Sequence, residues 1–172
     1  MHSSWVCAGC GRGYDPIAFG KAGYDATGLD FAETGVASAK QELADTQPPP
    51  AGTVNFVCGD FFKHNPEQKY DVILDYTFLC ALQPEQRPAW AAQMAALLAP
   101  DGELVTLIFP IIEKGGGPPF AVSLDTFTQL LTPHGLHAVH LDYLPVELCH
   151  PDRDGQNGNP RTGLGRWRFQ QS

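Results

Sequence analysis

The sequence predicts an α/β protein with a mostly parallel sheet and helices on both of its faces. Short apolar runs alternate with helix-like segments along the chain, which is typical of a parallel α/β sheet. The most apolar run, residues 103–109, suits a central strand that is buried on both faces. Two further apolar runs, 136–144 and 165–169, predict a final strand pair that gives the sheet an antiparallel C-terminal strand.

The first half of the chain carries most of the predicted strands. They lie at residues 5–7, 24–29, 54–58 and 70–75. Helices are predicted over 13–22 and 32–44, where helix-forming residues run without breakers. Gly23 closes the first helix and the prolines at 48–50 stop the second.

The second half predicts two more helices. Pro84 and Glu85 suit the start of a helix over 84–98, and the Pro-Asp-Gly at 100–102 ends it. Ser123 can cap a helix over 124–131. With no internal repeat and no linker, the sequence predicts a single domain over residues 1–172.

Composition excludes several classes of protein. Eleven basic against 19 acidic residues give a net charge of −8, which does not suit a nucleic-acid or anionic-membrane partner. The 43% of hydrophobic residues excludes a disordered chain. No apolar run approaches the roughly 20 residues of a membrane helix, and the first residues do not resemble a signal peptide. The arginines 161, 166 and 168 are interpreted as a solvated basic face.

The cysteines at 7, 10, 58, 80 and 149 are odd in number and scattered, which predicts reduced thiols and a cytoplasmic protein. Cys7 and Cys10 form a CxxC, but no second pair completes a zinc site, so a turn role is favoured over redox or metal binding. The histidines at 134, 137 and 140 would not all share one face of a strand. No metal site is predicted.

The strongest local signal is a glycine-rich turn directly after the first strand. Gly9, Gly11 and Gly13 let the backbone bend and approach a ligand closely, and a helix follows them. Asp30 ends the second strand, 19 positions after Gly11, which suits a carboxylate that accepts hydrogen bonds from ribose hydroxyls. The motif predicts a nucleoside-containing cofactor. The alternative is a glycine turn beside a solvated aspartate.

The glycine spacing is GxGxG, whereas a dinucleotide fold prefers GxGxxG. It resembles motif I of the class I methyltransferases, which bind S-adenosylmethionine. This resemblance implies that Asp60, after the third strand, lies near the adenine amino group and that Phe61 lies beside the ring. The alternatives are a helix N-cap for Asp60 and core packing for Phe61.

Several longer segments resemble the thiopurine methyltransferase superfamily, in its thiol, thiocyanate and halide methyltransferase branch. They lie at residues 75–82, 84–90, 100–107, 116–120 and 164–167. The resemblance runs from Cys7 to Trp167 and implies a Rossmann-like class I methyltransferase sheet. Two departures are a shorter segment before the first strand, which implies that the usual N-terminal cap is lacking, and Ala8 where the family commonly has proline.

Carried over position by position, the resemblance implies a set of functional residues. Tyr76 would lie where methyl donor and acceptor meet and would be the catalytic residue, although a core aromatic is the alternative. The implied cofactor-binding residues are Gly9, Gly11, Gly13, Asp30, Asp60, Phe61 and Tyr76.

The implied reaction is S-adenosylmethionine-dependent methyl transfer to a small soft nucleophile: a thiol, hydrosulfide, thiocyanate or halide. Such acceptors are already anions, so alignment and exclusion of water suffice. Tyr76, Phe78 and the loop 111–120 are candidate acceptor walls. The expected partner is a small molecule and the expected state a monomer.

Two other hypotheses stay open at this point. One is a truncated, catalytically impaired relic that still binds the cofactor. The other is a nicotinamide-dependent oxidoreductase, although no lysine follows Tyr76 at the Tyr-x-x-x-Lys spacing.

Overall fold

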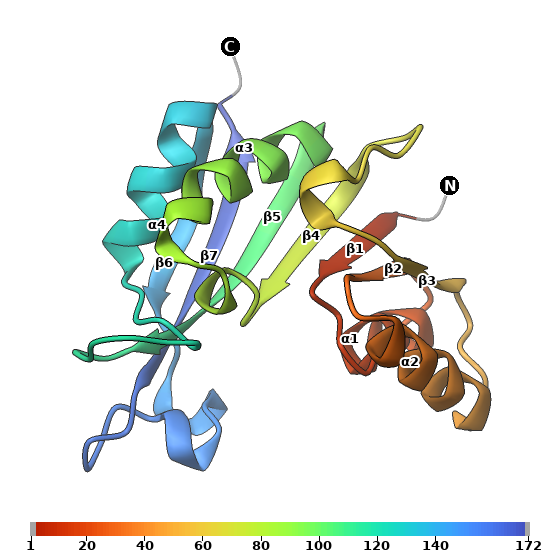
Figure 1. Ribbon diagram of the computed structural model, residues 1–172, viewed down its shortest axis with the longest axis horizontal. Helices are drawn as coiled ribbons and strands as arrows, with labels where there is room; N and C mark the ends of the chain where they lie inside the picture. Colours follow the sequence, from red (N-terminus) through yellow and green to blue (C-terminus); the bar gives the residue numbers. More distant parts are fainter. Residues whose placement is uncertain (1–2, 171–172) are drawn as a thin grey trace. The chain divides into compact units, whose positions relative to one another are not determined.

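The computed structural model describes residues 3–170 and confirms the α/β fold (Figure 1). The strands are β1 (Ser4–Ala8), β2 (Asp25–Asp30), β3 (Val54–Cys58), β4 (Tyr70–Tyr76), β5 (Leu98–Ile111), β6 (Leu136–Tyr143) and β7 (Arg161–Phe169). The α-helices are α1 (Tyr14–Lys21), α2 (Glu33–Asp45), α3 (Arg87–Leu97) and α4 (Leu124–Leu131). Short 3₁₀ turns include η1 (Phe61–Lys63), η2 (Leu79–Ala81), η3 (Pro84–Gln86) and η6 (Pro151–Arg153).

The strands are hydrogen-bonded in the order β3-β2-β1-β4-β5-β7-β6. The chain divides into two compact units. The first unit comprises the residues up to 74 together with 97–102, and the second comprises 75–96 together with the residues from 103 onward. The single domain expected over 1–172 stays a prediction.

The first unit is a parallel α/β layer. β1 pairs with β2 in parallel, and β2 pairs in parallel with β3. Apolar side chains of the strands, such as Val6 and Leu29, are buried with Ile17 of α1 and Val36 of α2. The start of β4 is tied to β1, because the Ser4 backbone N–H donates to Asp71 Oδ2 over 2.8 Å.

The second unit is antiparallel, as expected for the C-terminal strands. β7 pairs antiparallel with both β5 and β6. Trp90 of α3 and Phe127 of α4 meet edge to face, with ring centroids 5.6 Å apart, and both are buried. Trp167 of β7 is also buried and donates through Nε1 to Thr106 Oγ1 of β5 over 3.0 Å. This unit therefore has its own aromatic core.

Two of the three C-terminal arginines are not simply solvated, which corrects the sequence interpretation. Arg168 Nε donates to Glu103 Oε2 over 2.7 Å, and Arg166 Nη2 donates to the same oxygen over 3.0 Å. The hydrogen bond from Arg166, with further help from Arg168, lowers the pKa of Glu103. Since β5 and β7 are neighbours, the carboxylate of one strand binds guanidinium groups of the other.

Two predicted elements differ from the observed ones. The helix expected over 84–98 begins as the 3₁₀ turn η3 and becomes α-helical only at Arg87, because Pro88 has no N–H to donate to the carbonyl of residue 84. The Pro-Asp-Gly expected to end this helix lies inside β5, which already starts at Leu98. There Gly102 approaches the Asp71 carbonyl so closely that a Cβ would lie 2.9 Å from its oxygen.

Within residues 3–170, no helix is long and apolar enough to cross a membrane.

Asp75, the residue before the last in β4, is the most deeply buried carboxylate among the described residues of the second unit. It is 0% exposed. Its Oδ2 accepts from Trp90 Nε1 over 2.9 Å and from the Leu79 backbone N–H over 3.2 Å, and its Oδ1 accepts from the Phe78 N–H over 3.2 Å. The carboxylate thereby joins the end of β4 to η2 and α3. Burial raises its pKa from 3.8 to about 6, although these hydrogen bonds oppose the rise.

Asp75 should make the stability of the fold depend on pH. Since its pKa is higher in the folded state, the folded protein holds a proton there between about pH 4 and pH 6 that the unfolded chain has lost. The Asp75 contribution to the free energy of unfolding is therefore full below pH 4 and falls as the pH rises through 6. An Asp75→Asn variant cannot titrate, so the advantage of wild type over the variant should shrink by about 3 kcal/mol across this range.

Urea unfolding at several pH values measures this difference. Asp101→Asn is the control, because Asp101 is an exposed aspartate of β5. Parallel pH profiles for wild type and Asp75→Asn would contradict the prediction.

Candidate cofactor and acceptor site

The glycine-rich turn between β1 and α1 has a backbone that only glycine adopts easily. Gly9, Gly11 and Gly13 have φ values of 66°, 51° and 80°, all in the left-handed region. The Gly9 and Cys10 N–H groups both donate to the Leu29 carbonyl, over 2.9 and 3.1 Å. The turn is thus attached to the end of β2.

The side chain of Asp30 completes this attachment. Its Oδ2 accepts from the Gly11 N–H over 2.7 Å, and its Oδ1 accepts from the Ala32 N–H over 2.9 Å. Asp30 is half-buried, at the end of β2. A carboxylate has about four acceptor sites, so roughly two remain for a ligand. The structure therefore brings Asp30 to the glycine turn, as a ribose-binding carboxylate requires.

The glycines at 11 and 13 have different surroundings. A Cβ on Gly11 would meet no atom within 4 Å, so this part of the turn faces open space. A Cβ on Gly13 would lie 2.6 Å from Phe56 Cζ and 2.8 Å from Ala39 Cβ. Gly13 is thus required for packing against β3 and α2, while Gly11 leaves room for a ligand beside Asp30.

The loop after β3 reaches the same end of the first unit. The Gly59 N–H donates to the Asp30 carbonyl over 2.9 Å. Asp60 caps η1, because its Oδ1 accepts from the Phe62 N–H over 3.0 Å, and Lys63 Nζ lies 3.5 Å from its Oδ2. Phe61 is buried and meets Phe62 edge to face. Both residues thus have the structural roles that were the alternatives, and their adenine contacts stay predictions.

The CxxC of the turn is buried and reduced. Cys7 and Cys10 are free thiols. Burial raises the pKa of both thiols, that of Cys10 to about 12, with nearby carboxylates as a smaller cause. Burial also raises the pKa of Asp15, in the first turn of α1. Thiols that hold their protons this firmly are poor nucleophiles and metal ligands, so a structural role fits the pair.

Sequence reasoning missed Phe31 and Gly35. Phe31 directly follows Asp30 and is 79% exposed, which is unusual for a large apolar side chain. A Cβ on Gly35, in the first turn of α2, would lie 3.5 Å from the Gly11 carbonyl oxygen and 3.6 Å from Asp30 Oδ1. The sequence did offer a signal for Phe31, because this aromatic residue directly follows Asp30, the acidic residue that ends the second strand.

Tyr76, at the end of β4, belongs to the second unit. It is half-buried and does not lie in a closed core. Its hydroxyl oxygen accepts from Arg153 Nη1 over 2.6 Å, and the Arg153 guanidinium carbon lies 5.8 Å from the centre of its ring. Its role as a cofactor contact and catalytic residue stays a prediction. Arg153 was missed, because nothing in its polar, turn-rich segment marks it.

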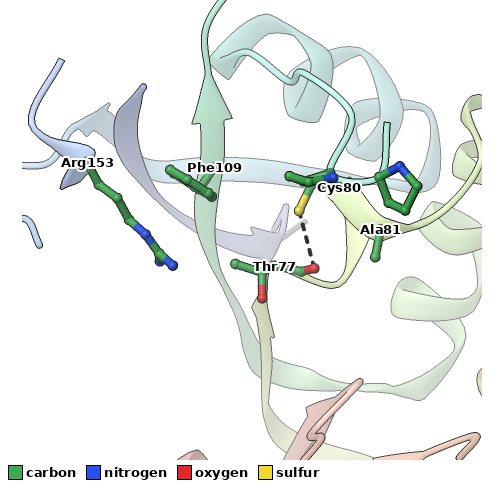
Figure 2. A pocket seen from close by; sticks show the side chains of 7 residues that line it. Thr77, Cys80, Ala81, Phe109 and Arg153 are labelled. Atoms are coloured by element: carbon green, nitrogen blue, oxygen red, sulfur yellow. Dashed lines mark hydrogen bonds between the residues drawn. The ribbon is translucent and has the colours of Figure 1, made fainter. Parts of the chain in front are cut away.

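A cavity of about 370 Å³ lies beside this pair in the second unit (Figure 2). We call it the acceptor cavity, after the acceptor role that the sequence analysis predicts for the loop 111–120. It is lined by Thr77, Cys80, Ala81, Phe109, residues 118–119 and Arg153. Of the candidate acceptor walls, the loop 111–120 contributes its two prolines to the lining, whereas Tyr76 and Phe78 are not among the lining residues. Their acceptor role stays a prediction. The volume lies in the range of small-molecule sites.

Thr77 holds an unusual conformation at the edge of the acceptor cavity. Its φ of 61° is rare for a β-branched residue and costs about 1–3 kcal/mol. The residues that follow Thr77 are held in place, because the Phe78 and Leu79 N–H groups donate hydrogen bonds to the Asp75 carboxylate. Cys80 Sγ donates to the Thr77 carbonyl over 3.2 Å. Strain that is held in this way is typical of binding and catalytic sites.

No group of three His, Cys, Asp or Glu side chains within residues 3–170 is arranged to hold a metal ion. The histidines at 134, 137 and 140 are all exposed.

The fold is that of solved methyltransferases. A SAM-dependent methyltransferase from Methanosarcina mazei matches 99% of this chain and 94% of its own, with a TM-score of 0.78 and 12% identity. Magnesium protoporphyrin IX methyltransferase from Synechocystis PCC 6803, solved with bound SAH, matches 98% of this chain and 75% of its own, with a TM-score of 0.76 and 16% identity. These matches confirm the Rossmann-like methyltransferase sheet.

Sequence comparisons identify the family within the methyltransferase class. A family model described as thiopurine S-methyltransferase matches residues 2–151, and the chain belongs to this family. It is 41% identical to thiocyanate methyltransferase 1 of Arabidopsis thaliana over 160 residues. The aligned region covers 93% of this chain and 66% of that relative. Probable thiol methyltransferase 2 of the same plant is 40% identical, with 93% and 67% covered. The chain thus spans about two thirds of the length of these relatives.

The family assignment confirms the resemblance found in the sequence. It also agrees with the predicted class of enzyme, a methyltransferase, and with S-adenosylmethionine as the cofactor of that class. The alternative of a nicotinamide-dependent oxidoreductase finds no support in these relatives.

Gly11→Ala and Gly13→Ala should both destabilise the fold, but by different amounts. In Gly11→Ala the new methyl group has free space, so only the left-handed backbone is strained, by about 1–2 kcal/mol. In Gly13→Ala the methyl group meets Phe56 and Ala39, so overpacking of about 1–3 kcal/mol adds to the same backbone strain. Thermal unfolding should therefore show the larger loss of Tm for Gly13→Ala. An equal or larger loss for Gly11→Ala would show that the space beside Gly11 is not free.

Proposed function

We propose that this protein transfers a methyl group from S-adenosylmethionine to a small soft nucleophile, of the thiol or thiocyanate kind, with hydrosulfide and halides as further acceptors. The observation that carries the proposal is the hydrogen bond between Asp30 and Gly11, because it places a carboxylate with spare acceptor capacity beside an open glycine turn. The relatives named thiocyanate and thiol methyltransferase support the acceptor class.

The residues of the first unit fit an adenosine. Asp30 would accept hydrogen bonds from the ribose hydroxyls with the acceptor sites that Gly11 and Ala32 leave free. The open space at Gly11 would take the part of the cofactor that follows the ribose, and Gly9 and Gly13 would shape the turn. Asp60 and Phe61 would lie at the adenine, and the exposed Phe31 is a further apolar surface for it.

When bound, S-adenosylmethionine supplies a methyl carbon attached to a positively charged sulfur, which an anionic acceptor displaces without a general base. The chain's own contribution is to align the acceptor and to exclude water. Tyr76 would stand at the meeting point of donor and acceptor, and the apolar walls of the acceptor cavity, Ala81, Phe109 and the prolines at 118–119, would desolvate the acceptor. No buried Cys or Asp of the glycine turn is needed for proton transfer.

Asp30→Ala should weaken cofactor binding. The variant loses the charge-assisted hydrogen bonds to the ribose, worth about 1.5–3 kcal/mol, which corresponds to about a 10- to 150-fold rise in Kd. Asp30→Asn keeps one oxygen and should fall between wild type and Asp30→Ala. Calorimetric titration with S-adenosylmethionine and S-adenosylhomocysteine measures both variants.

Asp45→Ala is the control for this titration, because Asp45 is exposed at the end of α2, where it accepts a hydrogen bond from the Gln41 side chain. Unchanged affinity in Asp30→Ala would remove Asp30 from the site.

Product formation tests the reaction itself. Wild type with S-adenosylmethionine should form methyl thiocyanate from thiocyanate, methanethiol from hydrosulfide and methyl iodide from iodide, all measurable by headspace gas chromatography. Asp30→Ala should lose most of this product at low cofactor concentration and recover part of it at high concentration, because its defect lies in binding. If the cofactor binds and no acceptor yields product, the protein is a cofactor-binding relic and the proposed transfer is wrong.

A further inference from the structure

Arginine side chains in the second unit have different partners. Arg166 and Arg168 both bind the carboxylate of Glu103. Arg161 stacks on Tyr143, with its guanidinium carbon 3.4 Å from the ring centre. Arg153 forms no ion pair with any Asp or Glu among residues 3–170, and it is half-buried. A guanidinium that is partly desolvated and lacks a carboxylate can pair with an anion from outside the chain.

Uncharged and aromatic groups hold Arg153 in place. Its guanidinium carbon lies 4.4 Å from the centre of the Phe109 ring, and its Nη1 donates to the Tyr76 hydroxyl. Figure 2 shows the side chain reaching past Phe109 toward Thr77. A guanidinium has five N–H donors, and the hydrogen bond to Tyr76 occupies one of them. Arg153 therefore lies at the acceptor cavity in a defined position with donors still available.

The other lining residues of the acceptor cavity carry no negative charge that could pair with the Arg153 guanidinium. Ala81, Phe109 and the prolines at 118–119 are apolar. Cys80 could be an anion, but burial and the nearby Asp75 carboxylate raise its pKa to about 11, so it remains a thiol at neutral pH. The Cys80 thiol donates a hydrogen bond to the Thr77 carbonyl. The cavity thus combines one cation with walls that carry no negative charge.

We propose that Arg153 binds the methyl acceptor as an anion in the acceptor cavity and so determines the preference for anionic acceptors. This inference rests on the proposed function and adds the group that recognises the substrate. Guanidinium is a weakly hydrated cation, and its aromatic neighbours favour a polarisable partner. A small anion of low hydration, such as thiocyanate or iodide, suits this cavity better than a neutral molecule.

Direct binding of thiocyanate tests the proposal without any need for turnover. Wild type saturated with S-adenosylhomocysteine is titrated with ¹³C-labelled thiocyanate and followed by ¹³C NMR line width. Arg153→Gln should weaken thiocyanate binding about tenfold or more, and Arg153→Lys should keep part of it, because the charge remains. Arg161→Gln, which removes an arginine outside the cavity, should bind thiocyanate like wild type.

The outcomes separate this inference from the proposed function. If S-adenosylhomocysteine binds to Arg153→Gln with wild-type affinity while thiocyanate binding is lost, both stand. If thiocyanate binds equally well to wild type and Arg153→Gln, or does not bind to wild type, the role of Arg153 is wrong whatever the cofactor does. If S-adenosylhomocysteine does not bind to wild type, the proposed function fails, and the same titration without nucleotide still decides the role of Arg153.

Steady-state kinetics give a second readout. Arg153→Gln should raise KM for thiocyanate and iodide about tenfold or more, with the Kd of S-adenosylmethionine within a factor of about two of wild type. Thermal unfolding of Arg153→Gln and Arg153→Lys confirms that both variants are folded. An unchanged KM in a folded Arg153→Gln protein would overturn the proposal.

Discussion

The structure depends on aspartates that stand at or just after the carboxyl ends of strands and accept hydrogen bonds from the backbone of the next turn. Asp30 at the end of β2 accepts from Gly11 and Ala32, Asp60 after β3 accepts from Phe62, and Asp75 in β4 accepts from Phe78 and Leu79. Each of these turns would otherwise leave backbone N–H groups unpaired where the chain leaves the sheet. The same residue type thus determines the local backbone at every candidate site.

Burial decides which of these carboxylates can also serve a ligand. Asp75 is fully buried, and its oxygens accept hydrogen bonds from Trp90 and from the backbone. Burial raises its pKa, and it acts on the acceptor cavity from behind, by holding the turn around Thr77 and by raising the pKa of Cys80. Asp30 is half-buried and binds a single backbone N–H through each oxygen. A half-exposed carboxylate with free acceptor sites is the one that can bind sugar hydroxyls.

Local sequence patterns predicted most of the fold and the conformation of the glycine turn. The strand at 54–58 agrees with β3, Ser123 caps α4 as expected, and the glycine turn has the predicted conformation. Each of these depends on residues that are neighbours in sequence. The helix ends before the Pro-Asp-Gly at 100–102, as expected, but the strand expected from residue 103 already begins at Leu98 and includes these residues. Local pattern did not reveal this, because the close approach of Gly102 to Asp71 comes from a distant segment.

The sequence by itself determined the alternation of strands and helices, the glycine turn and its spacing to Asp30, and the family to which the chain belongs. Only the tertiary structure decided the environment of each charge: Arg166 and Arg168 neutralised by Glu103, and Arg153 placed over Phe109 beside an apolar cavity. These arginines look alike in the sequence. Their differences arise from side chains more than forty positions away, which only folding brings within the few ångströms over which partly buried charges interact strongly.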